Sequence, residues 1–161
     1  ETLAGFQAVF QKEGITLTTG FAEESLVVEC NPLDMQSLLT NLLMNAVDAL
    51  RGAPRKEIRI ATLRSAGLAK ITITDTGTGI DPETQLLIFD PFFTTKESGQ
   101  GTGLGLSISH RLVIEHGGTL GVESTLGAGT TFEVALPIVE LEPVESRQDQ
   151  GSDQSLTETI H

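Results

Sequence analysis

The stretch Ile71-Thr-Ile-Thr-Asp75-Thr-Gly77-Thr-Gly79 decides the fold of this 161-residue chain. Its first four residues are all β-branched, which predicts a buried strand. Asp75 follows at once and leads into a Gly-x-Gly turn. The two glycines would allow positive φ and a close approach of the backbone to a ligand. Taken alone, Asp-x-Gly-x-Gly is more often a plain turn than a site, so its neighbours must decide.

The segments on either side predict a mixture of strands and helices. Leu33–Leu50 carries apolar residues at helical spacing, with a polar stripe that includes Asn41 and Asn45. A second helix is expected over Leu104–His116 and a short one after Asp81, while Phe89–Gly103 is expected to be a loop. Strands are expected at residues 14–21, 26–30, 57–63, 69–75, 119–124 and 130–136. This order indicates a two-layer α/β (α+β) sandwich, a mixed sheet covered on one face by helices.

Composition narrows the class of ligand and partner. The formal net charge is −12, from 22 acids against 10 bases, which argues against nucleic-acid binding. A polyanionic ligand would therefore need a divalent cation and locally placed positive groups. No apolar run approaches the roughly 18 residues of a membrane span, so no direct membrane contact is expected. The single cysteine, Cys30, cannot form an internal disulfide, which favours the cytoplasm.

The chain divides into three parts by composition. Residues 1–12 have helical apolar spacing and are either the end of a preceding helical domain or a helix leading into this one. Residues 13–138 are expected to form one domain. Residues 139–161 are acidic and poor in core-forming residues, which predicts a disordered tail or linker.

Three further segments stand in order around Asp75. They are Asn41-Leu-Leu-Met-Asn45-Ala46, Phe89-Asp-Pro-Phe-Phe-Thr-Thr-Lys96 and Gly101-Thr-Gly103-Leu-Gly105-Leu106. The set resembles the N, G1, F and G2 boxes of the histidine kinase catalytic domain, in the ATP-binding superfamily shared with gyrase, Hsp90 and MutL. The residues Phe-Phe-Thr-Thr-Lys and Gly-Thr-Gly-Leu-Gly-Leu are similar to those of the family's nitrogen-regulator and dicarboxylate-sensor branch. The resemblance, from about Gly14 to Pro137, implies the Bergerat ATP-binding fold.

The resemblance also implies an adenine site. In the family, the aspartate at the position of Asp75 reads the base, by accepting hydrogen bonds from the exocyclic amine of adenine. Guanine presents a carbonyl at that place and would be repelled. Gly77 and Gly79 would bring the backbone close to the nucleotide. Thr130 matches a hydroxyl that supports the same base edge, usually through water, although a plain strand residue is an alternative for it.

A phosphate and metal site is implied next to the base site. Asn45 aligns with the family's invariant asparagine and is the expected Mg²⁺ ligand, with Asn41 nearer the phosphates or a coordinating water. Hydrolytic relatives carry a glutamate base at the position of Asn41, and an amide cannot accept that proton. Lys96 is the candidate cation for the β- and γ-phosphates. The expected phosphate-binding loop and helix start comprise Gly101, Thr102, Gly103, Leu104, Gly105 and Leu106.

The implied activity is that of the catalytic part of a two-component sensor kinase. It would bind Mg-ATP and donate the γ-phosphate to a histidine on a helical dimerisation and phosphoacceptor domain, and indirectly serve a response regulator. None of His110, His116 and His161 is followed by an acid, so the acceptor histidine is expected elsewhere. The segment Phe92–Gly103 is expected to be a nucleotide-ordered lid. A nucleotide-gated interaction module and an anti-sigma-type serine kinase are the alternatives.

Overall fold

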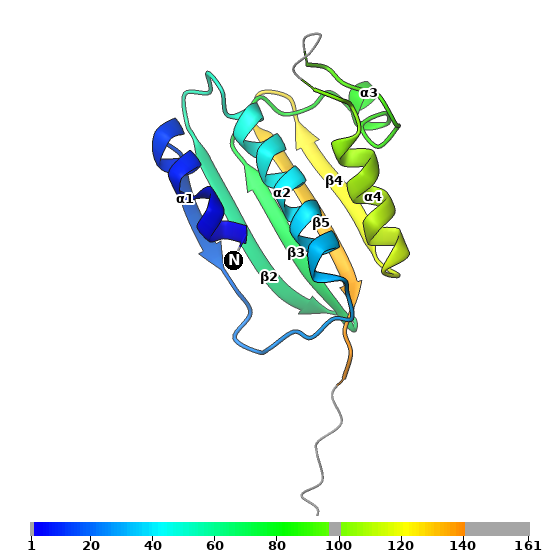
Figure 1. Cartoon of the computed structure of the whole chain (residues 1–161). Coiled ribbons are helices and arrows are strands. Elements are labelled where there is room, and N and C mark those ends of the chain that lie inside the picture. Colours follow the sequence, from blue (N-terminus) through cyan, green and yellow to red (C-terminus); the bar gives the residue numbers. More distant parts are fainter. Residues whose placement is uncertain (1, 97–100, 141–161) are drawn as a thin grey trace, which may run out of the picture.

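The computed structural model describes residues 2–96 and 101–140. Residues 141–161 of the acidic tail expected over 139–161, with His161, lie outside these residues, and so do residues 97–100 of the expected lid. Within the described residues, helices and strands form the two layers predicted from the sequence (Figure 1).

The sheet has five strands in the order β1-β2-β3-β5-β4. β1 pairs parallel to β2, and the other three pairings are antiparallel, so the sheet is mixed as expected. The bounds are β1 Thr16–Gly20, β2 Glu57–Ser65, β3 Leu68–Asp75, β4 Thr119–Thr125 and β5 Gly129–Pro137. β3 therefore lies in the middle of the sheet and delivers Asp75 to one end of it.

The helices α1, α2 and α4 lie on one face of the sheet (Figure 1). Their bounds are α1 Thr2–Glu13, α2 Pro32–Ala49 and α4 Gly105–Glu115, and α3 is a single turn over Pro82–Gln85. Alternate residues of β3 point at the helices, as Ile73 and Asp75 are buried while Lys70 and Thr72 are only half-buried. The side chains between the helices and this face of the sheet form the core, and those such as Leu42 of α2 are fully buried.

Helix starts follow the local chemistry of the sequence. Asn31 caps α2 by accepting a hydrogen bond from the N–H of Leu33, and Asp81 caps α3 in the same way through Thr84. Proline occupies the first turn of both helices. α4 begins without any side-chain cap, which leaves its first N–H groups open to another acceptor.

One expectation changes, and one open alternative is favoured. Residues 26–30 are not a strand, because only an isolated bridge between Val28 and Ile138 forms there. Alternation of apolar residues is too short a pattern to separate a strand from an extended segment that lies over the core. At the N-terminus, Phe6 and Phe10 of α1 are buried in the same core as α2, which favours a helix leading into this domain.

Candidate nucleotide site

The residues singled out by sequence converge at one end of the sheet, where β3 ends, α2 ends and α4 begins (Figure 1). The turn after Asp75 is fastened to α2, because the N–H of Thr78 donates to the carbonyl of Ala49 at 3.1 Å. A Cβ on Gly77 would lie 2.6 Å from that same carbonyl oxygen. The turn can approach the helix this closely only because residue 77 is glycine.

The two glycines of the turn serve different purposes, which corrects the expectation that both need positive φ. Only Gly79 has it, at +68°. A Cβ there would also lie 2.0 Å from the carbonyl oxygen of Thr125. Gly77 is instead required by its contact with Ala49. Sequence spacing shows that a turn is tight but not which neighbour crowds it.

Asp75 is a buried carboxylate, with 4% of its surface exposed. Its Oδ1 accepts a hydrogen bond from the N–H of Gly77 at 2.8 Å. Burial raises the pKa of Asp75 above its ordinary value, and backbone N–H groups of Gly77 and Thr130 partly oppose that rise. A buried carboxylate with a perturbed pKa marks a functional site more often than an exposed carboxylate does.

Thr130 lies directly across from Asp75 in the β3–β5 register and is equally buried. Its hydroxyl is 2.8 Å from the hydroxyl of Ser124, and Ser124 donates its own hydrogen to the carbonyl of Gly129 at 2.9 Å. Thr130 must therefore donate to Ser124, and the two lone pairs of the Thr130 hydroxyl can still accept. Ser124 also accepts from the N–H of Ile80, so it ties the turn after Asp75 to the hairpin. Sequence reasoning missed Ser124, since no motif includes it.

The two asparagines of α2 lie one turn apart and are both half-buried. Asn41 directs Nδ2 at the carbonyl of Gly105 and at the hydroxyl of Ser109, both at 3.3 Å. Within residues 2–96 and 101–140, no group of three or more His, Cys, Asp or Glu is arranged to hold a metal ion. A divalent cation here would depend on the amide oxygen of Asn45, which is a hard donor that fits Mg²⁺ together with phosphate and water.

Lys96 lies against α2, where its ammonium group pairs with Asp48, three residues after Asn45. Asp48 also pairs with Arg51 at 3.1 Å, and only 18% of its side chain is exposed. Asp48 lies on the polar stripe of α2 with Asn41 and Asn45, and the helical pattern of that stripe alone does not indicate a partner as distant in sequence as Lys96. The expected phosphate-binding cation is thus held next to the helix that carries Asn45.

The described ends of the expected lid are tied to each other. The N–H of Phe92 donates to the carbonyl of Gly103 at 2.9 Å, and both residues have positive φ, +68° and +65°. A Cβ on Gly103 would lie 2.5 Å from the carbonyl carbon of Phe92. Phe92 is 75% exposed, whereas Phe89 and Phe93 pack against the core.

The G2 residues lead into the uncapped start of α4. Thr102 accepts a hydrogen bond from the N–H of Leu104 at 3.3 Å, and Gly105 is the first helical residue. Leu106 packs against the core. A Cβ on Gly101 would lie 3.0 Å from the side chain of Lys96, which shows that the F and G2 segments are adjacent. Among the described residues, no acceptor pairs with the N–H groups of Gly105 and Leu106, so this helix start, with Lys96 nearby, suits an anion.

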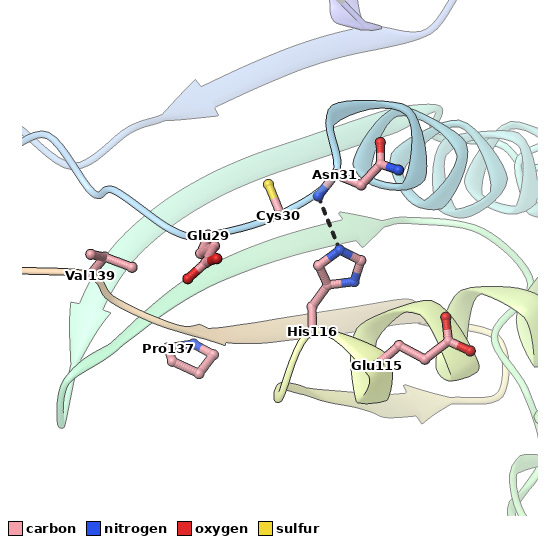
Figure 2. A pocket seen from close by; sticks show the side chains of 7 residues that line it. All are labelled: Glu29, Cys30, Asn31, Glu115, His116, Pro137 and Val139. Atoms are coloured by element: carbon pink, nitrogen blue, oxygen red, sulfur yellow. Dashed lines mark hydrogen bonds between the residues drawn. The ribbon is translucent and has the colours of Figure 1, made fainter.

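A hollow of about 510 Å³ lies at the opposite end of the molecule, between the start of α2 and the end of α4 (Figure 2). His116 is held in it by the carbonyl of Leu112 at Nδ1, 2.7 Å away, and by the N–H of Asn31 at Nε2, 3.1 Å away. Since a carbonyl only accepts, Nδ1 carries the hydrogen and Nε2 accepts. The thiol of Cys30 points away from this ring (Figure 2). Both ring nitrogens are engaged, so His116 is structural, as its position at a helix end suggests.

Among the helices of residues 2–96 and 101–140, none combines the length and apolar character that crossing a bilayer requires.

Comparison with protein families matches residues 30–140 to the model described as histidine kinase-, DNA gyrase B- and HSP90-like ATPase. Among curated proteins, the chain is 42% identical over 134 residues to the signal transduction histidine-protein kinase AtoS of Escherichia coli K12. That alignment covers 80% of this chain and 21% of AtoS. It is 41% identical over 120 residues to the two-component sensor PprA of Pseudomonas aeruginosa, covering 71% of this chain and 13% of PprA.

Solved structures agree with these relatives. A nucleotide-free form of the catalytic domain of the histidine kinase ThkA superposes with a TM-score of 0.74 at 30% identity. The match covers 84% of this chain and 88% of the ThkA domain. The mycobacterial sensor histidine kinase MprB superposes with a TM-score of 0.71 at 25% identity, covering 87% of this chain and 93% of the MprB chain.

Proposed function

Because this chain belongs to the histidine kinase-, DNA gyrase B- and HSP90-like ATPase family, we propose that it binds Mg-ATP and donates the γ-phosphate to a histidine. Its relatives are named sensor histidine kinases, and its structural neighbours are histidine kinase catalytic domains. The chain spans only about a fifth or less of the length of AtoS and PprA. The acceptor histidine is accordingly assigned to a separate helical dimerisation domain of the same kinase.

The observation that carries the proposal is the buried carboxylate of Asp75 at the end of the central strand β3. Oδ1 is occupied by the N–H of Gly77, so the carboxylate has a fixed orientation. The exocyclic amine of adenine is a donor and would be matched by the carboxylate, and the hydroxyl oxygen of Thr130 would accept from a bridging water. Guanine would set a carbonyl against the carboxylate, so adenine is the base that fits.

The phosphate end of the site is supplied by α2 and α4. Asn45 would hold Mg²⁺, and the bound cation would neutralise part of the phosphate charge. The open N–H groups at Gly105 and Leu106 would hold phosphate oxygens, and Lys96 would add a positive charge. These groups would offset the electrostatic repulsion between a triphosphate and a chain of net charge −12.

Transfer rather than hydrolysis is supported by residue 41. An asparagine cannot take a proton from water, and Nδ2 of Asn41 faces α4 instead of the solvent. Without a general base, water is a poor competitor for the γ-phosphate. In the proposed reaction an imidazole nitrogen of the acceptor forms a bond to the γ-phosphorus, the bond to the bridging oxygen breaks, and ADP leaves.

We place the domain in the cytoplasm, with the helical acceptor domain as direct partner and a response regulator as indirect partner. The test is to incubate the chain with γ-labelled ATP, Mg²⁺ and that helical domain. Label should appear on a histidine of the helical domain, as an acid-labile and base-stable phosphate, and the chain itself should stay unlabelled. Asn45→Ala should abolish the transfer.

The same experiment separates the alternatives. A nucleotide-gated interaction module would bind ATP and leave every protein unlabelled. A serine kinase would give acid-stable phosphate on its target. Either result, or acid-labile label on the chain alone, would overturn the proposed function.

A further inference from the structure

Ser109 is a serine of α4 that is completely buried, with 0% exposure, and the boxes of the nucleotide site do not include it. Its hydroxyl lies 3.3 Å from Nδ2 of Asn41 in the neighbouring helix α2. A serine buried in the core needs a hydrogen-bond partner, because leaving a buried hydroxyl unpaired is destabilising. Ser109 has that partner in Asn41, across 68 residues of sequence.

The orientation of the Asn41 amide follows from its other contact. The same Nδ2 lies 3.3 Å from the carbonyl oxygen of Gly105, and a carbonyl can only accept. The nitrogen must therefore face α4, and Oδ1 is left for other partners. Asn41 thus donates both of its amide hydrogens to the first turn and a half of α4, one to Gly105 and one to Ser109.

These bonds join the two halves of the phosphate site. α2 carries Asn45, the proposed magnesium ligand, one turn after Asn41. α4 carries the open N–H groups at its start, and Gly105 is its first residue. At the opposite end of the two helices, the N–H of Asn31 before α2 donates to His116 after α4, and fully buried apolar side chains such as Leu42 and Val113 belong to the core between them. Apolar contact is non-directional, whereas a pair of hydrogen bonds fixes how far one helix is shifted along the other.

We propose that Ser109 is a positioning residue: through Asn41 it sets the register between α2 and α4, and so the distance from the metal ligand to the phosphate-binding helix start. This inference rests on the proposed function and adds a residue to it. Ser109 acts through Asn41 and does not touch the nucleotide. Its loss should therefore weaken binding of the β- and γ-phosphates and leave the adenine end, at Asp75, unaffected.

The test compares three ligands in the presence of Mg²⁺: AMP, ADP and the non-hydrolysable analogue AMPPNP. Isothermal titration gives the affinity of each for the wild-type chain and for Ser109→Ala. Losing one buried hydrogen bond is expected to weaken AMPPNP by roughly three- to tenfold. The affinity for AMP should change less than twofold. Ser109→Cys, which replaces the hydroxyl by a slightly larger thiol that is a weak acceptor, should shift the affinities in the same direction.

Val113→Ala is the matched control, since Val113 is fully buried one turn further along α4. It should lower the melting temperature and leave the ratio of AMPPNP to AMP affinity unchanged. In a double-mutant cycle, Asn41→Ala and Ser109→Ala should be strongly non-additive, because they remove the same bond.

The outcomes are distinguishable. If Ser109→Ala weakens AMP and AMPPNP equally, or weakens neither, the positioning role is wrong while the proposed function stands. If the wild-type chain binds none of the three nucleotides, the proposed function itself fails. A phosphate-selective loss that disappears in the Asn41→Ala background supports the proposal.

Discussion

The ammonium group of Lys96 lies 2.5 Å from the Oδ2 of Asp48, which brings the F-box segment into contact with α2 beyond Asn45. Asp48 is 18% exposed and Lys96 is 36% exposed. The pair is therefore partly shielded from water. Its lysine is the cation that the phosphates would need, and Asp48 already holds it. To reach a γ-phosphate, Lys96 has to exchange Asp48 for the ligand.

The first prediction is that Asp48→Asn strengthens nucleotide binding. Removing the competing carboxylate frees Lys96 and also removes a negative charge next to the phosphates. Since partly exposed ion pairs contribute about 0–1 kcal/mol, we expect AMPPNP affinity to rise by up to roughly fivefold, and AMP affinity to rise less. Titration at low and at high salt measures the gain, which should shrink as salt screens the charges.

The control for this prediction is a double-mutant cycle with Lys96. In the Lys96→Ala background, Asp48→Asn should lose most of its effect, because Asp48 then has no lysine to hold. Arg51→Gln, which removes the other partner of Asp48, should not raise the affinity. Weaker AMPPNP binding by Asp48→Asn would show the opposite role, that Asp48 presents Lys96 to the phosphates.

The second prediction concerns adenine selectivity. Asp75→Ala should weaken ATP by about 1.5–3 kcal/mol, the value of a hydrogen bond to a charged group, and should weaken GTP far less. Nucleotide titrations of wild type and variant, each with ATP and GTP, give the selectivity directly. Equal affinities of the wild-type chain for the two nucleotides would contradict the assignment of Asp75.

The third prediction follows from the raised pKa of Asp75. For a carboxyl whose pKa is raised by folding, the stability contribution is present below the unfolded pKa and is lost as pH rises through the folded pKa. The free wild-type chain should therefore lose stability relative to Asp75→Ala as pH rises above the ordinary aspartate value of 3.8. Chemical unfolding of both proteins across this range measures the difference.

The selectivity for ATP over GTP should increase as pH rises, whereas the stability contribution of Asp75 should fall. Adenine is bound by the ionised carboxylate, so the ratio of ATP to GTP affinity should rise with pH through the same range. Taking the ratio cancels titration of the γ-phosphate, which both nucleotides share. A ratio that stays flat with pH in the wild-type chain would contradict this link.

Local patterns in the sequence predicted most of the fold, and long-range partners account for the rest. The period of α2, the cap at Asp81 and the hairpin of β4 and β5 are local features, and each is confirmed. The wrong strand at residues 26–30 was a short apolar segment whose pairing partner, Ile138, lies far along the chain.

In the candidate site, too, the motifs were predictable from the sequence and their long-range partners were not. Motif order indicated Asp75 and Thr130, which the sheet register places opposite each other. The partners of Lys96 and Asn41 came only from the structure, because they lie 48 and 68 residues away in the sequence. Asp48 beside Lys96 and Ser109 beside Asn41 are the examples. Both were part of regular helical patterns, which gave no signal of a partner.

The fourth prediction tests why residue 77 is glycine. Gly77→Ala places a Cβ against the carbonyl of Ala49, so the turn or α2 must shift, at a cost of about 1–3 kcal/mol. Nucleotide binding should fall with it, because the turn carries the backbone next to Asp75. Gly121→Ala on β4, where nothing lies within 4 Å, is the control and should leave binding unchanged. Normal stability of Gly77→Ala would refute the close-approach explanation.

The last prediction separates two neighbouring phenylalanines. Phe92 has a φ of +68° and is 75% exposed, so Phe92→Gly relieves backbone strain and loses little buried surface. Its melting temperature should be equal to that of the wild type or higher. Phe93 packs against the core, so Phe93→Ala should lose about 1–3 kcal/mol of stability. An exposed aromatic held outward by a strained backbone suits a partner surface, so Phe92→Gly should still bind ATP but transfer phosphate poorly to the helical domain. If Phe92→Gly destabilises the chain as much as Phe93→Ala does, Phe92 is a packing residue and this division of roles is wrong.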